Sequence, residues 1–186
     1  MNDGRERWAV VAPWLIFGFL VFVLAAGLYN PASWISSRQK ITVLHDGASA
    51  PLTSLPLWGQ AGLRFSTASW RGRPYVVHFF ANDCDDCRAD RDQLATMAAG
   101  HVAIVGVAVK DSADQIAAYV SEGNPFITVA RDGDGRAADQ WGVATLPETF
   151  LVDSYGIVRW HYIGRLTDDI VGTQLMPAWE AVQDGG

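Results

Sequence analysis

Residues 75–100 read YVVHFFANDCDDCRADRDQLATMAAG, and this one stretch sets the class of fold. Its first seven residues, 75–81, are aromatic and β-branched, which is typical of a strand that is buried on both faces of a sheet. Apolar residues then recur at helical spacing until Gly100, so the strand is followed by a helix. The only two cysteines of the chain, Cys84 and Cys87, therefore lie where a strand ends and a helix begins.

Four further segments have the apolar, β-branched character of strands. They are VAIVGVAV (102–109), FITVA (126–130), TFLVD (149–153) and IVRWHY (157–162). Ser112 and Gln115 form a capping-box pattern that predicts a helix ending near Gly123. Thr167 predicts a C-terminal helix that Pro177 should kink or break. Parallel strands need crossover helices, and the last two segments are close enough to form a hairpin. We therefore expect an α/β fold with a mixed central sheet flanked by helices.

An uncharged stretch of 22 residues, 8–29, precedes this part of the chain. About 20 apolar residues suffice to cross the hydrocarbon core of a bilayer, so the stretch predicts one N-terminal transmembrane helix. It is longer than the apolar centre of a cleaved signal peptide, which favours an uncleaved anchor. Positive residues flank both of its ends, so charge alone does not set its orientation.

The composition excludes two classes of protein. Apolar residues make up 49% of the chain and aromatic residues 11%, which rules out a disordered protein. The formal charge of −6 disfavours a nucleic-acid partner. Residues 1–40 carry four basic and two acidic side chains, a net of +2, whereas residues 41–186 carry ten and eighteen, a net of −8. The two parts of the chain are therefore expected to meet different surroundings.

The spacing C-x-x-C at the start of a helix is typical of thiol redox chemistry. A helix N-terminus stabilises a thiolate, so Cys84 is expected to attack a disulfide of the partner and Cys87 to resolve the mixed disulfide. Next to a βαβ pattern the motif is a thioredoxin-like signature. A zinc site is disfavoured because the chain offers no second pair of ligands, and we expect neither metal nor cofactor. A purely structural disulfide or an inert pair stays open.

Three aspartates, Asp83, Asp85 and Asp86, surround the two cysteines in the sequence. Acidic neighbours raise the pKa of a thiol, and a dithiol whose thiolate is not stabilised is the better reductant. These residues therefore suggest a reductant whose potential they modulate. The alternative interpretation is a solvated helix start, where acidic side chains interact favourably with the helix dipole.

The stretch GVATLPETFLVDSYGIVRWHYIG, residues 142–164, resembles the membrane-anchored thioredoxin-like proteins of cytochrome c maturation, the DsbE/CcmG type. The resemblance implies a thioredoxin fold and reduction of disulfides in apocytochrome c, with electrons supplied by a membrane thiol-disulfide donor. It also implies a single-pass protein of the bacterial inner membrane with its catalytic domain in the periplasm. The expected parts are then a cytoplasmic N-terminus (1–7), an anchor (8–29), a linker and lead-in segment (30–60) and the thioredoxin-like domain (61–186).

The same resemblance assigns roles to four consecutive residues. The bond before Pro147 is expected to be cis, with the proline packed against the cysteine pair. The backbone of Thr145 and Leu146 would then pair with an extended substrate. Glu148 would be an acidic group beside the thiols that handles a proton for Cys87.

The chain departs from this family at the cysteines themselves, where relatives usually have tryptophan before the first cysteine and proline after it. Asp83 and Asp85 stand there instead. Two alternatives therefore stay open. One is a thiol reductase for another envelope protein, such as an oxidase assembly factor. The other is a Cu(I) chaperone that binds the metal through the two thiols, with His161 as its only plausible third ligand.

Overall fold

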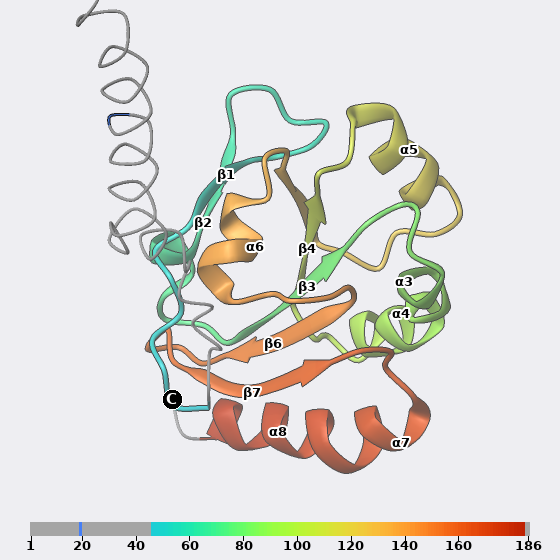
Figure 1. Ribbon diagram of the computed structural model, residues 1–186. Coiled ribbons are helices and arrows are strands. Elements are labelled where there is room, and N and C mark those ends of the chain that lie inside the picture. Colours follow the sequence, from blue (N-terminus) through green and yellow to red (C-terminus); the bar gives the residue numbers. More distant parts are fainter. Residues whose placement is uncertain (1–18, 20–45, 185–186) are drawn as a thin grey trace, which may run out of the picture. The chain divides into compact units, whose positions relative to one another are not determined.

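The structure is a computed structural model that describes residue 19 and residues 46–184 (Figure 1). The chain divides into two units, Met1–Lys40 and Ile41–Gly186, and the second contains the cysteines. The predicted N-terminus (1–7) and most of the anchor (8–29) and of the linker lie outside the described residues. Among the residues that are described, no helix is long and apolar enough to cross a membrane.

Within residues 46–184, five strands form the main sheet in the order β5-β4-β3-β6-β7. Strand β3 lies at the centre, parallel to β4 and antiparallel to β6, while β5 continues the parallel side and β7 the antiparallel side. This confirms the α/β fold with a mixed sheet. The bounds are β3 (Tyr75–Phe80), β4 (Ile104–Val109), β5 (Thr128–Asp132), β6 (Glu148–Val152) and β7 (Val158–Ile163).

Strand β5 begins two residues later than the sequence predicts. The N–H of Phe126 donates to the side chain of Asn124 at 3.1 Å, which closes a turn at the place where the strand is predicted to start. The side chain of Phe126 is buried all the same, so its apolar character reflects packing and not strand pairing.

Helices cover both faces of the sheet. Their bounds are η1 (Thr67–Trp70), α3 (Asp85–Ala89), α4 (Arg91–Ala99), α5 (Ala113–Ser121), α6 (Arg136–Trp141), α7 (Asp168–Ile170), the π-helical turn η2 (Val171–Leu175) and α8 (Met176–Asp184). Both hydrogen bonds of the capping box between Ser112 and Gln115 are present, as predicted. The predicted break at Pro177 is wrong: α7, η2 and α8 follow one another without a gap and α8 runs beside β7 (Figure 1). Pro177 follows the π-helical turn η2 by two positions, so the regular α-helical hydrogen bonding is interrupted next to the proline although the helix continues.

Helix α6 is absent from the sequence-based expectation, which places no helix between the strands predicted over 126–130 and 149–153. The carboxylate of Asp132 accepts the N–H groups of Ala137 at 3.1 Å and Ala138 at 2.8 Å, so a residue four positions before the helix caps it. A helix of six residues with a remote cap has too little periodicity to be recognised from sequence.

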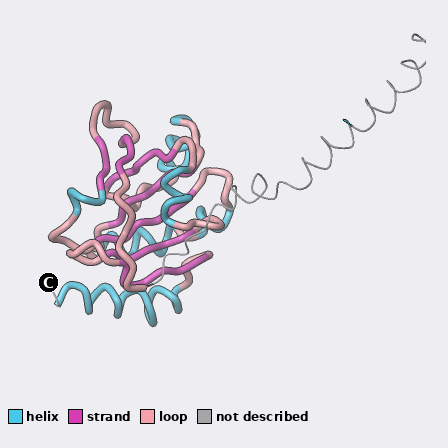
Figure 2. The backbone as a smooth tube through the Cα atoms, turned by 60° about the vertical axis from the view of Figure 1, so that its left-hand side comes forward, coloured by secondary structure: helices cyan, strands magenta, loops and turns pink. Residues whose placement is uncertain are grey.

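Two hydrophobic cores lie on opposite faces of the sheet, and they explain why β3 is buried at every position. On one face, Phe80 and Cys87 pack with residues of α4, α5 and the C-terminal helix. On the other face, Phe79 packs with Trp141 of α6 and with Phe65 of β2. Figure 2 shows the C-terminal helix outside the strands in a second view.

The described part of the lead-in segment, residues 46–60, packs onto the domain. It contains strand β1 (Ser54–Pro56), which pairs with β2 (Arg64–Ser66). The N–H of Gly47 donates to the carbonyl of Val158 at 2.7 Å, at the start of β7. Further along, Leu57 forms a bridge with Ala130 of β5. The predicted domain boundary at residue 61 therefore falls inside the packed unit.

Candidate active site

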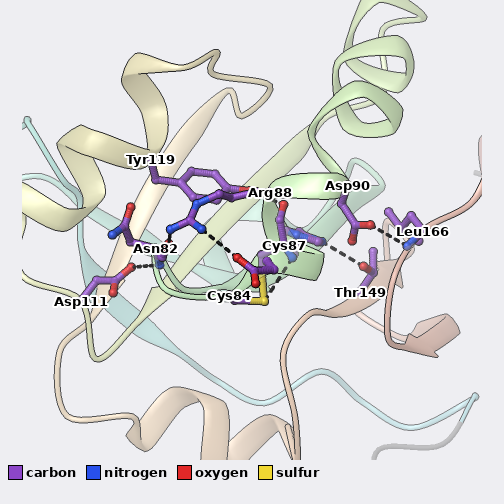
Figure 3. Close-up of a disulfide and its surroundings, with 11 residues drawn as sticks. Asn82, Cys84, Cys87, Arg88, Asp90, Asp111, Tyr119, Thr149 and Leu166 are labelled. Carbon is purple, nitrogen blue, oxygen red and sulfur yellow. Dashed lines mark hydrogen bonds and ion pairs between the residues drawn. A yellow bond between two sulfur atoms is a disulfide. The ribbon is translucent and has the colours of Figure 1, made fainter.

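Cys84 and Cys87 form a disulfide at the start of α3, with their sulfur atoms 2.06 Å apart (Figure 3). Cys84 is the N-cap residue of this helix, and its sulfur accepts the N–H of Cys87 at 3.1 Å. The hydroxyl of Tyr119 donates to the carbonyl of Cys87 at 2.7 Å and so fixes the helix from the α5 side. Cys84 is half-buried, whereas Cys87 is fully buried. A partner therefore reaches the sulfur of Cys84 first.

The three aspartates of the motif lie on the solvent side of the disulfide, since Asp83, Asp85 and Asp86 are all exposed. The carboxylate of Asp85 pairs with the guanidinium of Arg88 at 3.0 Å, and Arg88 also donates to the carbonyl of Asn82. These acids therefore form a hydrated rim around the start of α3.

A fourth carboxylate, Asp90, is missed by the sequence-based reasoning. It is fully buried at the end of α3, where one oxygen accepts the N–H of Leu166 at 2.7 Å (Figure 3). Its other oxygen has no hydrogen-bond partner among the described residues. Burial raises the pKa of Asp90 to about 7, although the bond from Leu166 and the charge of Arg165 act in the opposite direction. The sequence does contain one signal that could reveal Asp90. Asp90 lies three positions after Cys87, and residues at this spacing share one face of a helix.

The segment before β6 lies as predicted in one respect: the bond between Leu146 and Pro147 is cis. Pro147 is buried, Leu146 is half-buried and Thr145 is exposed. Leu146 and Cys84 both pack against the core that contains Cys87. A groove of about 340 Å³ runs between Asp83 on one side and Thr145 and Leu146 on the other. The structure thus places Thr145, Leu146 and Asp83, the residue just before the accessible cysteine, around one concave surface.

Glu148 is fully buried at the start of β6. One of its carboxylate oxygens accepts the N–H of Ala144 at 3.2 Å. The other lies 3.5 Å from Nε2 of His161 on β7, and neither of these two atoms has a hydrogen-bond partner in the described part of the chain. The ring of His161 stacks on Phe150 with centroids 4.2 Å apart. Glu148, which the resemblance predicts to lie beside the thiols, therefore has His161 as its neighbour. The sequence suggests this histidine only as a third ligand for Cu(I).

The described part of the structure does not supply the third ligand that the Cu(I) alternative requires. No group of three or more His, Cys, Asp or Glu side chains within residues 46–184 is arranged to hold a metal ion. The structure thus does not bring His161 and the two sulfur atoms together.

His78 is fully buried in the middle of β3. Its Nδ1 lies 3.0 Å from the hydroxyl of Thr149 on β6. Burial lowers the pKa of His78 to about 3, so the ring stays neutral at physiological pH.

Known proteins that resemble this chain in sequence and in structure agree with its fold and its cysteine pair. Residues 47–161 match the AhpC/TSA family. A protein of Xylella fastidiosa (strain 9a5c) named "Thiol:disulfide interchange protein DsbE" is 32% identical over 182 residues, which cover 95% of this chain and 90% of the relative. The crystal structure of a putative DsbE from Chlorobium tepidum superposes with a TM-score of 0.64 at 24% identity, covering 73% of this chain and 99% of the other. The structure of MTB dsbF gives a TM-score of 0.61 at 28% identity, with coverages of 70% and 95%. The first two of these proteins carry the name thiol:disulfide interchange protein, and the two structures share the thioredoxin-like fold.

Proposed function

Because the chain belongs to the DsbE-type thiol:disulfide interchange proteins of the AhpC/TSA family and is a thiol:disulfide oxidoreductase, we propose that it reduces disulfides of an apocytochrome c in the bacterial periplasm. The observation that carries the chemistry is the unequal exposure of the two cysteines. Cys84 caps α3 and is accessible, while Cys87 lies directly behind it in the core.

The reaction begins with the dithiol form. The thiolate of Cys84, stabilised by the N–H of Cys87 and by the start of α3, attacks one sulfur of the client disulfide. A mixed disulfide forms, and the first client thiolate leaves and takes up a proton. Cys87 then gives its proton to Glu148 and attacks the sulfur of Cys84. This step forms the disulfide described above and releases the second client thiolate, so two electrons have passed to the client.

The client polypeptide is bound at the groove next to Cys84. Its extended backbone pairs with the exposed edge at Thr145 and Leu146, which the buried Pro147 holds in place. The groove walls are mostly apolar but include Asp83, so the residues that flank the client cysteine contact both kinds of surface.

The rim aspartates adjust the potential of the couple. Asp85 is partly compensated by Arg88, whereas no ion pair is recorded for Asp83 or Asp86 within residues 46–184. Uncompensated negative charge next to Cys84 disfavours its thiolate and so makes the dithiol a stronger reductant.

The electrons come from a thiol-disulfide donor in the membrane, and no cofactor takes part because the two cysteines carry both electrons. Residues 8–29 anchor the protein in the inner membrane, with residues 1–7 in the cytoplasm and residues 30–60 leading to the periplasmic domain. The support for this arrangement is the uncharged length of residues 8–29.

A second candidate is reduction of another envelope protein, such as an oxidase assembly factor. The observation that favours it is the position of Asp83, which stands where relatives have tryptophan and lines the groove. The client contacts of the relatives therefore do not carry over at this point.

The test is the reduction potential of the full chain in dithiothreitol or glutathione redox buffers, read by thiol alkylation. A potential near or below about −270 mV supports a reductant, whereas a potential near about −120 mV contradicts it. The client is tested with two oxidised peptides under one set of conditions. One carries the C-x-x-C-H haem-attachment motif, and the other carries the same cysteines in an unrelated sequence. Faster reduction of the first supports the cytochrome client, and equal rates favour the second candidate.

A further inference from the structure

We infer that His161 carries protons between the buried Glu148 and solvent, once in each catalytic cycle. This inference rests on the proposed role of Glu148 as the group that takes the proton of Cys87. It assigns to His161 a task in thiol exchange, in which the histidine acts through Glu148 and not on sulfur directly.

Glu148 cannot exchange protons with water by itself, since its side chain is fully buried. A carboxylate that has taken a proton from Cys87 must lose it before the next client can be processed. One oxygen of Glu148 is already occupied by the N–H of Ala144 at 3.2 Å. The free oxygen is therefore the atom at which the proton is taken up and given away.

The free oxygen of Glu148 faces a group that transfers protons readily. Nε2 of His161 is 3.5 Å away, and for the stretch of chain that the structure describes this pair is the only recorded contact of either atom. A distance of 3.5 Å is slightly longer than a hydrogen bond, and catalytic hydrogen bonds tighten when the substrate binds. An imidazole accepts a proton on one nitrogen and releases one from the other.

His161 also has the access to water that Glu148 lacks. Its side chain is 11% exposed, β7 is the edge strand of the sheet, and stacking on Phe150 keeps the ring in place. His78 provides an internal contrast, because it is fully buried, its one recorded side-chain hydrogen bond within residues 46–184 is to Thr149, and burial keeps it neutral. The exposed fraction and the acidic partner together single out His161.

The proton balance of the step is complete. The thiol of Cys87 gives its proton to the carboxylate of Glu148, and the thiolate attacks Cys84. The carboxyl group of Glu148 then passes the proton to Nε2 of His161, and the imidazolium releases a proton to water. Glu148 returns to its carboxylate form, and His161 returns to its starting tautomer once its ring nitrogens have exchanged a proton with water. One proton has then left the protein for the thiol that was consumed.

The experiment separates attack by Cys84 from resolution by Cys87. The reduced full chain, purified in a mild detergent, is mixed with glutathione disulfide, quenched with acid at successive times and analysed by mass spectrometry for the glutathionylated species. His161→Phe removes the ring nitrogens but retains an aromatic ring to stack on Phe150. We expect an unchanged rate of glutathionylation and a rate of resolution that is lower by about tenfold or more, so that the mixed disulfide accumulates.

Chemical rescue distinguishes a proton carrier from a structural residue. In His161→Ala, which leaves space at the ring position, added imidazole should restore resolution in a concentration-dependent manner. In the double variant with Glu148→Gln, imidazole should have no effect, since the carboxylate that it would serve is gone. His101→Asn is the matched control, because His101 is exposed and its φ of 64° suits asparagine; it should behave like the parent.

Resolution at the parental rate in His161→Phe overturns the inference, and so does slow resolution in His161→Ala that imidazole fails to accelerate. A parent chain that does not react with glutathione disulfide at all contradicts the proposed function itself. The two failures are thus distinguishable, because the first is measured on a chain that still forms the mixed disulfide.

Discussion

The carboxylates assigned to the site fall into two groups, and the groups differ in what surrounds them. Asp83, Asp85 and Asp86 form a rim that is open to water, whereas Asp90 and Glu148 are enclosed in the protein. Water and salt screen the charges of the rim, but they do not reach the two buried carboxylates, Asp90 and Glu148. The comparison teaches that the number of acids near a thiol says less about its chemistry than their burial does.

The largest expected effect concerns Asp90 and the stability of the fold. Its pKa is raised from 3.8 to about 7 by burial, so the folded state binds a proton that the unfolded state has lost. The stabilisation is therefore complete below about pH 4, and it is lost as the pH rises towards 7. Relative to Asp90→Asn, the parent should lose about 4 kcal/mol of unfolding free energy between pH 4 and pH 8, measured by urea denaturation. Parallel pH profiles of the two proteins would contradict the buried, protonated carboxyl.

The next effect concerns Glu148 and catalysis. In Glu148→Gln, the group that accepts the proton of Cys87 is gone, and the resolution step should slow by about 100-fold. Single-turnover reaction with glutathione disulfide measures this rate. The rate at which Cys84 forms the mixed disulfide serves as the control within the same experiment, and a common slowing of both steps would point to misfolding instead.

The rim should respond more weakly and in a salt-dependent way. Replacing Asp83 and Asp86 together by asparagine removes negative charge near Cys84, which lowers the pKa of its thiol and makes the protein a weaker reductant. We expect the reduction potential to rise by less than about 30 mV, and by less still in 1 M salt. A larger shift that persists in salt would mean that the rim acts like the buried group.

The smallest effect is expected at the ion pair between Asp85 and Arg88, in which the carboxylate of Asp85 is exposed to solvent. Arg88→Gln removes this pair, and the melting temperature should stay within about two degrees of the parent because exposed pairs contribute little. Thermal unfolding followed by circular dichroism measures the change. A drop of more than about five degrees would show that the bond from Arg88 to the carbonyl of Asn82 matters for the fold.

The sequence was sufficient for the features that depend on local pattern. Strands β3, β4 and β6 are apolar runs because both faces of the sheet are covered there, and the two cysteines follow β3 at the start of α3. The cis bond before Pro147 followed from family resemblance and was confirmed. These features require no knowledge of which distant residues meet.

The features that the sequence did not reveal depend on register and burial. His161 lies opposite Phe150, and a shift in the pairing of β6 and β7 follows within two residues, between Leu151 and Val152. A slip of one residue would turn His161 to the other face of the sheet, so its partner could not be deduced from alternation alone. Asp90 was missed for a related reason, because its burial is completed by Leu166, 76 residues further along the chain.

The bond from Gly47 to Val158 has a consequence for how the protein meets a large client. Val158 lies at the start of β7, whereas Ile163 at its other end is opposite Glu148. The chain therefore joins the domain at one end of the sheet, while exchange takes place at the other. The contact at Gly47 and the reacting cysteine therefore lie at opposite ends of the sheet, so a bulky polypeptide docked at Cys84 leaves the bond between Gly47 and Val158 in place.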